Sequence, residues 1–209
     1  MTRFIVVRHG ETEWNRQGRY QGHLDSPLTP VGHAHGRALA DRLARHRFTA
    51  LYSSDLGRAR RTAELVAGRT GHAVLLDARL RERNLGIFQG LTKAEVKGGF
   101  PAEYRLHKTP DFVIPQGESA RQRFECAVSC FEELARIHAS EQIVVVTHGG
   151  VISAMLRHVL GIPLEAPRRF ARANASWNRF VHHEGTWFLE TWGDLSHLEQ
   201  DPGHQEPCL

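Results

Sequence analysis

The chain has 209 residues, 41% of them hydrophobic and 24% charged, which is the balance of a globular domain with a substantial core. Its formal net charge is +4 at pH 7, but the arginines are dispersed and form no nucleic-acid-binding motif, so we expect no nucleic-acid partner. No apolar run is long enough to cross a membrane and no signal-peptide layout stands at the N-terminus, so we expect a cytoplasmic protein without a membrane partner.

The first expected element is a buried strand over residues 3–7, a short β-branched run that ends in Arg8 and His9. In open α/β sheets, ligands bind at the carboxyl ends of the strands. Gly10 follows the histidine and lets the backbone turn sharply and approach a ligand closely. A cation and an imidazole therefore stand where a ligand site is expected.

Strands and helices then alternate along the first half of the chain. The expected elements are a loop at 16–29, a helix begun by Thr29 and Pro30 and continued to about 44, a strand at 51–52, a helix capped by 53–55 and ended by 68–71, and a strand at 73–76. This alternation predicts a parallel sheet covered by helices on both faces.

Residues 80–118 are the least regular part of the chain, because glycines and prolines interrupt them. Short helices are expected at 93–96 and 102–107, and the whole segment is expected to cover the site as an insert. We expect residues 1–199 to form one domain, and the polar tail at 200–209 to be disordered.

The second half repeats the design of the first strand. A helix from Ser119 to about residue 138 leads to an apolar strand at 142–147, which ends in His148 and Gly149. A helix at 151–160 and a hairpin of strands at 177–182 and 187–192 complete the chain. Two parallel strands that both end in His-Gly would bring both imidazoles to one rim of one sheet.

These motifs resemble those of the histidine phosphatase superfamily, which includes the cofactor-dependent phosphoglycerate mutases. The segments that carry the resemblance are Arg8-His9-Gly10-Glu11-Thr12-Glu13-Trp14-Asn15, Ser53-Ser54-Asp55-Leu56-Gly57-Arg58-Ala59-Arg60-Arg61-Thr62-Ala63, Leu80-Arg81-Glu82, Gly117-Glu118-Ser119 and Thr147-His148-Gly149. The last expected turn, residues 193–198, is similar to the tail of the small bacterial phosphatase branch. The resemblance implies an α/β three-layer sandwich with a mostly parallel central sheet.

The resemblance also implies roles for five residues. His9 is the expected nucleophile, which forms a phosphohistidine, and His148 is expected to donate a hydrogen bond to the phosphoryl group. Arg8 and Arg58 supply planar guanidinium groups that fit phosphate oxygens. Glu82 matches the acid position of the family, and we expect burial and nearby negative charge to raise its pKa so that it protonates the leaving group.

Further residues are assigned to substrate binding on the same grounds. They are Asn15, Gln21, Gly22, Arg83 and Gly149. The remaining histidines show no converging ligand spacing, so we expect no metal. The expected partner is a small phosphorylated metabolite. An exposed edge of the sheet would leave room for a homodimer, and the sequence does not decide the oligomeric state.

Three functions share these residues. Water as the phosphoryl acceptor gives a phosphomonoesterase of the histidine acid phosphatase type, which is the favoured prediction. A retained phosphoglycerate as acceptor gives a mutase, which needs 2,3-bisphosphoglycerate, whereas the phosphatase needs no cofactor. The mutase pattern has His-Tyr-Gly after Glu-Arg, and here residues 84–86 are Asn-Leu-Gly. A non-catalytic protein that binds a phosphorylated partner is the third alternative, and the intact site disfavours it.

Overall fold

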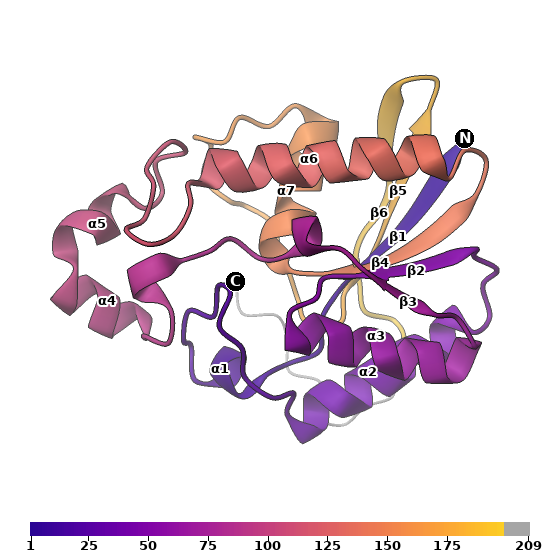
Figure 1. The fold of residues 1–209 in the computed structure, drawn as a ribbon, viewed down its shortest axis with the longest axis horizontal. Helices are drawn as coiled ribbons and strands as arrows, with labels where there is room; N and C mark the ends of the chain where they lie inside the picture. Colours follow the sequence, from indigo (N-terminus) through magenta and orange to yellow (C-terminus); the bar gives the residue numbers. More distant parts are fainter. Residues whose placement is uncertain (199–209) are drawn as a thin grey trace.

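The computed structural model describes residues 1–198 and places one six-stranded sheet between two layers of helices (Figure 1). The strands are β1 (Thr2–Arg8), β2 (Ala50–Ser53), β3 (Val74–Leu76), β4 (Gln142–Thr147), β5 (Trp177–His183) and β6 (Thr186–Asp194). They lie in the order β3-β2-β4-β1-β5-β6. The first four are parallel, and β5 and β6 form an antiparallel hairpin at one edge. The predicted α/β class with a mostly parallel sheet is confirmed.

Helices cover both faces of this sheet. The helices within the described residues are α1 (Glu13–Arg16), α2 (Pro30–Leu43), α3 (Gly57–Thr70), α4 (Lys93–Gly99), α5 (Pro101–Leu106), α6 (Ala120–Ile137) and α7 (Gly149–Leu160). Figure 1 shows α2 and α3 on one face and α6 and α7 on the other, with α4 and α5 beyond one end of the sheet. No helix within residues 1–198 is long and apolar enough to cross a bilayer.

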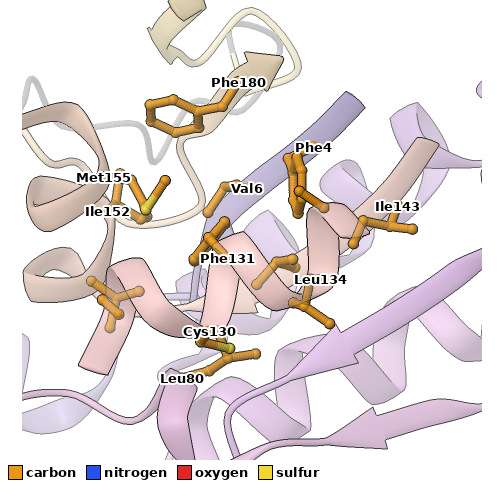
Figure 2. Packing of buried hydrophobic residues seen from close by; sticks show 14 of the residues in the cluster. Phe4, Val6, Leu80, Cys130, Phe131, Leu134, Ile143, Ile152, Met155 and Phe180 are labelled. Atoms are coloured by element: carbon orange, nitrogen blue, oxygen red, sulfur yellow. The ribbon is translucent and has the colours of Figure 1, made fainter. Parts of the chain in front are cut away.

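The central strand β1 is buried on both faces, because its side chains alternate between two cores. Phe4 and Val6 pack with Phe131 of α6 in one core, which Figure 2 shows from close by. Ile5 and Val7 belong to the second core, under α2 and α3. Successive side chains of a strand point to opposite faces, so a continuous apolar run is what a strand between two helical layers requires.

Helix starts follow the predicted caps with one exception. Thr29 accepts a hydrogen bond from the Gly32 amide at the start of α2, and Ser119 forms a capping box at the start of α6. The predicted cap of α3 by residues 53–55 is wrong, because Leu56 precedes that helix and makes no side-chain cap. The Oδ1 atom of Asp25, from a distant loop, accepts from the Arg58 amide at 3.3 Å instead.

The insert at residues 80–118 has a small core of its own. Phe88, Val96 and Ile114 are fully buried in it, and partly buried aromatic and aliphatic side chains surround them. Its helices α4 and α5 agree with the expectation of short helices in this segment. The tail that we expected to be disordered, residues 200–209, lies outside the described residues.

Candidate active site

The two sequence-predicted histidines meet at one rim of the sheet. β1 and β4 are neighbours, with Arg8 paired in register with Thr147. The amide of His9 donates to the Thr147 carbonyl at 3.0 Å, which extends the pairing by one residue. The ring centroids of His9 and His148 are 5.2 Å apart. Neighbouring parallel strands that stop at the same level have therefore brought together residues that are far apart in the sequence.

The protonation of His9 follows from its surroundings. Its Nδ1 lies 2.7 Å from the Gly10 carbonyl oxygen, which can only accept, so Nδ1 carries the proton. Burial, and then the charges of Arg58 and Arg8, hold the pKa of His9 well below its usual value. His9 is therefore neutral at pH 7, and its Nε2 has a free lone pair. An imidazole in this state is a nucleophile.

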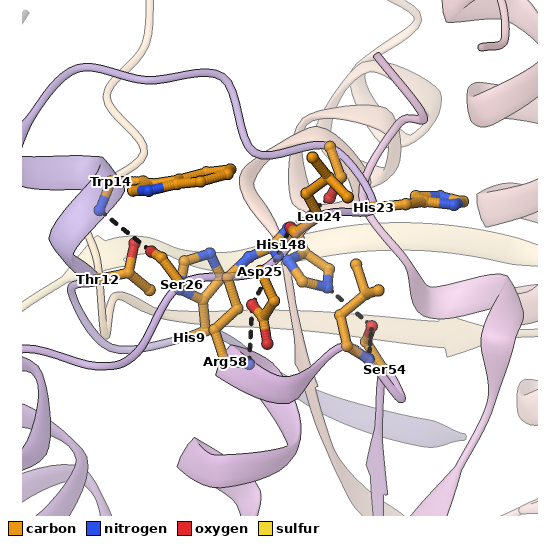
Figure 3. Close-up of polar contacts among 12 residues, drawn as sticks. His9, Thr12, Trp14, His23, Leu24, Asp25, Ser26, Ser54, Arg58 and His148 are labelled. Carbon is orange, nitrogen blue, oxygen red and sulfur yellow. Dashed lines mark hydrogen bonds and ion pairs between the residues drawn. The ribbon is translucent and has the colours of Figure 1, made fainter. Parts of the chain in front are cut away.

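His148 is buried behind this nucleophile and is held by a serine (Figure 3). Its Nε2 lies 2.8 Å from the Ser54 hydroxyl oxygen, whereas its Nδ1 is buried without a partner among the described residues. Burial and the charge of Arg58 hold the pKa of His148 well below its usual value. The direction of this hydrogen bond depends on the tautomer of the ring: if Ser54 donates to Nε2, the neutral ring keeps its proton on Nδ1 and can donate it to a ligand.

Arg58 stands at the start of α3 and is 2% exposed. Its Nη1 donates to the Leu24 carbonyl and to Asp25 Oδ1, both at 3.0 Å, and its Nη2 donates to the Gly22 carbonyl at 2.8 Å. The Nε of Arg58 is buried without a partner within residues 1–198. The loop thus fixes the guanidinium group in place and leaves donor capacity for an anion.

Arg8 is the second guanidinium next to His9. It donates from Nη1 to the Arg172 carbonyl, and its Nε is buried without a partner in the described part of the chain. Burial, followed by the charge of Arg172, lowers the pKa of Arg8 to about 10, so it is still a cation at neutral pH. The buried cation of Arg58 and the half-buried cation of Arg8, both beside His9, make this rim attractive to an anion such as a phosphoryl group.

Glu82 lies against the first turn of α7. Its Oε1 accepts from the Arg83 amide at 2.8 Å, and its Oε2 accepts from the Gly150 amide at 3.0 Å. The expected rise in the pKa of Glu82 is wrong. Burial raises the pKa of Glu82, but the charge of Arg172 and the two amide donors outweigh burial, so the pKa is lowered.

A cavity of about 770 Å³ opens at this rim. It lies within the size range of pockets that hold whole metabolites. The predicted site residues that line it are Arg8, His9, Asn15, Gln21, Gly22, Arg58, Glu82 and Arg83. His148 and Gly149 are not part of the lining. Instead Gly150, the next residue of α7, reaches the cavity.

Comparison with known proteins identifies the family. The model of the histidine phosphatase superfamily (branch 1) matches residues 4–195. This chain belongs to the histidine phosphatase superfamily. A probable phosphoglycerate mutase GpmB from Klebsiella pneumoniae is 35% identical over 207 residues, which cover 95% of this chain and 96% of that relative.

Solved structures of the superfamily also resemble this chain. Bacillus stearothermophilus YhfR has a TM-score of 0.87 and 31% identity, covering 95% of this chain and 100% of that one. A mycobacterial glucosyl-3-phosphoglycerate phosphatase has a TM-score of 0.79 and 34% identity, covering 91% and 98%. The chain is thus related to enzymes of the phosphatase and mutase type.

Three of the residues assigned to substrate binding lie where this superfamily site opens to the cavity. The Oδ1 of Asn15 accepts from Thr12 and from Asn174, which leaves its amide nitrogen to donate to a ligand. Gln21 is buried, and its Oε1 has no partner among the described residues. Gly22 has a φ of +55° and orients its carbonyl toward Arg58.

The other two residues have different surroundings. Arg83 uses all three guanidinium nitrogens on backbone carbonyls of the insert, namely those of Glu118, His107 and Phe112. It therefore ties residues 107–118 to the site. Gly149 lies beside Arg8 and Arg172, and a Cβ on it would meet them at an ordinary 3.5 Å.

Four residues of this site were not expected from the sequence. Ser54 contacts His148, Asp25 holds Arg58, and the Nδ2 of Asn174 donates to the His9 carbonyl at 3.0 Å. Arg172 lines the cavity next to Glu82. Ser54 stood inside a quoted motif, but nothing in the sequence showed that it faces His148. Within residues 1–198, no group of three His, Cys, Asp or Glu side chains could hold a metal ion.

Proposed function

We propose that this protein hydrolyses phosphomonoesters of small metabolites through a phosphohistidine on His9. The observation that carries the proposal is the neutral His9, whose Nδ1 is fixed by the Gly10 carbonyl at 2.7 Å and whose Nε2 has no hydrogen-bond partner within residues 1–198. Arg8 and Arg58 stand beside it, each with a buried Nε that is unpartnered among the described residues. A nucleophile between cations is what transfer of a phosphoryl group requires.

In the first step, Nε2 of His9 attacks phosphorus, and the bond between phosphorus and the ester oxygen breaks. Arg8, Arg58 and Nδ1 of His148 stabilise the charge on the three other oxygens. The leaving oxygen takes a proton from Glu82, so an alcohol departs and the phosphoryl group stays on the histidine.

In the second step, a water molecule attacks the phosphohistidine. Glu82, now a carboxylate, removes a proton from that water, and the bond between phosphorus and nitrogen breaks to release inorganic phosphate. Neutral His9 and protonated Glu82 are restored, which closes the cycle.

Glu82 must hold a proton for the first step, although the charge of Arg172 and the two amide donors lower its pKa. A phosphoryl dianion beside it supplies the missing influence, because a nearby like charge raises the pKa of a carboxyl group. The same dianion neutralises the cations that otherwise stabilise the carboxylate. Substrate binding thus favours the protonated form of Glu82.

Phosphoglycerate mutase activity is the second candidate, because relatives such as the Klebsiella protein carry that name. In that reaction the phosphohistidine returns its phosphoryl group to the substrate, and 2,3-bisphosphoglycerate primes the enzyme. Leu85, which stands where the mutase pattern has tyrosine, lines the cavity with an apolar side chain. This residue and the similarity to a phosphatase structure favour hydrolysis.

The nucleophile is tested with His9→Ala. We expect loss of para-nitrophenyl phosphate hydrolysis and of the acid-labile phosphoprotein seen with wild type in rapid quench. His183→Ala, at a half-exposed histidine of the β5–β6 hairpin, is the matched control and should behave as wild type. Turnover by His9→Ala at the wild-type rate would refute the assignment.

The acceptor is tested with 3-phosphoglycerate, with and without 2,3-bisphosphoglycerate. Release of inorganic phosphate without formation of 2-phosphoglycerate is expected for the phosphatase. Fast isomerisation that depends on the bisphosphate, with little phosphate released, would assign the protein as a mutase.

A further inference from the structure

The cavity carries more positive charge than one phosphoryl group requires. Its lining contains the nine cations Arg8, Arg19, Arg58, Arg83, Lys108, Arg123, Arg157, Arg168 and Arg172, against the two carboxylates Glu82 and Glu165. A phosphoryl group carries at most two negative charges, so the excess of cations persists when it binds.

Several of these cations already have partners. Arg19 pairs with Glu95 at 3.1 Å, and Arg58 pairs with Asp25 at 3.0 Å. The charge of Arg172 has the largest cationic influence on the pKa of Glu82. Arg83 is half-buried and Arg123 is nearly buried, and both donate to backbone carbonyls.

Arg8, Lys108, Arg157 and Arg168 remain, and of these Arg157 and Arg168 lie at the end of α7 and in the segment that follows it. Neither of these two has a carboxylate within 4.0 Å in the described part of the chain, and Glu165 lies 3.5 Å from Arg121, which also pairs with Asp111. Arg157 donates to the Pro163 and Ala166 carbonyls and so holds the backbone before Arg168 in place. The wall is therefore built, and its uncompensated charge is that of Arg168, an exposed side chain whose Nη1 donates to the Phe170 carbonyl at 2.9 Å.

This wall faces the phosphoryl site. Arg168 and Arg172 line the same cavity as His9, and both lower the pKa of Arg8 through repulsion between like charges. Phe170, which lines the cavity beside them, is fixed edge-on against Trp192 with ring centroids 5.4 Å apart. Cations that lie close to each other repel, and an anion bound between them relieves this repulsion.

We propose that the cavity holds phosphomonoesters with a second anionic group, a carboxylate or a second phosphate, and that Arg168 with Arg157 and Arg172 binds that group. Guanidinium groups pair with either anion through two parallel hydrogen bonds. This inference rests on the proposed phosphatase function, since it names the class of substrate for the same site.

Three compounds built on glycerol test the proposal. Glycerol 3-phosphate has no second anion, 3-phosphoglycerate replaces its terminal hydroxymethyl group by a carboxylate, and glycerol 1,3-bisphosphate adds a phosphate. We expect kcat/KM for at least one of the two compounds with a second anionic group to exceed that for glycerol 3-phosphate about tenfold or more, and the better of the two identifies the anion. A tenfold ratio corresponds to about 1.4 kcal/mol.

Arg168→Gln should reduce this selectivity ratio about tenfold by removing a charge-assisted hydrogen bond. Arg169→Gln is the matched control, because Arg169 is the adjacent arginine, is exposed like Arg168, and does not line the cavity. Its ratio should equal that of wild type. A ratio near one in wild type, or equal ratios in the two variants, would overturn the inference while leaving hydrolysis intact.

A binding measurement distinguishes failure of the proposed phosphatase function from failure of the second-anion site. Calorimetric titration of His9→Ala with the same three compounds does not require turnover. If no compound is hydrolysed but the second anion still tightens binding in a manner that depends on Arg168, the binding site stands and the phosphatase proposal falls. Equal binding of all three compounds refutes the second-anion site.

Discussion

Gly150→Ala should remove most of the activity without unfolding the protein. A Cβ at this position would lie 1.9 Å from Oε1 and 3.0 Å from Cδ of Glu82, so the carboxyl group must move. The Gly150 amide would also lose its 3.0 Å hydrogen bond to Oε2. Because Glu82 is the proposed acid, displacing it should cost about 100-fold in kcat/KM, within the range of about 10²–10⁴ for general acid catalysis.

The effect on stability should be small, because two contributions oppose each other. Gly150 lies in the first turn of α7, where alanine favours the helix over glycine by about 1 kcal/mol. Loss of the hydrogen bond to Glu82 costs about 1 kcal/mol. The free energy of unfolding, measured in urea, should therefore change by less than about 1 kcal/mol.

Substrates with different leaving groups sharpen the assay. The leaving group of glycerol 3-phosphate is a strongly basic alkoxide that needs a proton, so this substrate should show the full loss of kcat/KM. The leaving group of para-nitrophenyl phosphate is the weakly basic para-nitrophenolate, so kcat/KM for this substrate should fall only about tenfold. Gly68→Ala is the control, since a Cβ at that position in α3 meets nothing within 4 Å.

A double variant decides whether Glu82 mediates the loss. In Glu82→Ala, the carboxyl group that Gly150→Ala would strike is absent, so the two substitutions together should be no worse than Glu82→Ala alone. Full activity of Gly150→Ala on glycerol 3-phosphate, or additive losses in the double variant, would refute the role of Glu82.

The histidines give two further predictions. Ser54→Ala removes the hydroxyl that lies 2.8 Å from Nε2 of His148. We expect kcat to fall about tenfold with KM unchanged. A wild-type kcat would contradict the positioning role of Ser54. Because the pKa values of His9 and His148 lie well below 6.5, the unfolded chain binds protons that the folded protein excludes. The free energy of unfolding should therefore keep its full value above pH 6.5. As the pH drops below 6.5, it should decrease by up to about 1.4 kcal/mol per pH unit for each histidine. Urea titrations at pH 7, 6 and 5 should show a shallower decline in His9→Gln/His148→Gln and an unchanged decline in His183→Ala; equal declines in all three would contradict the linkage.

The order of elements was readable from local patterns. Apolar runs marked β1 and β4, and Thr29 and Ser119 marked the starts of α2 and α6, because periodicity and capping depend on neighbouring residues only. The placement of His9 beside His148 could also be inferred, since parallel strands present their carboxyl ends to one rim.

Other features depend on contacts between distant segments, and only the tertiary structure decided them. Asp25 replaces the expected local cap of α3, and Arg83 donates to carbonyls of the insert. The lowered pKa of Glu82 results from Arg172, about ninety residues away in the sequence. Charges and hydrogen bonds act across space, so a residue type can indicate a chemical role while its protonation state is set by neighbours that the sequence does not reveal.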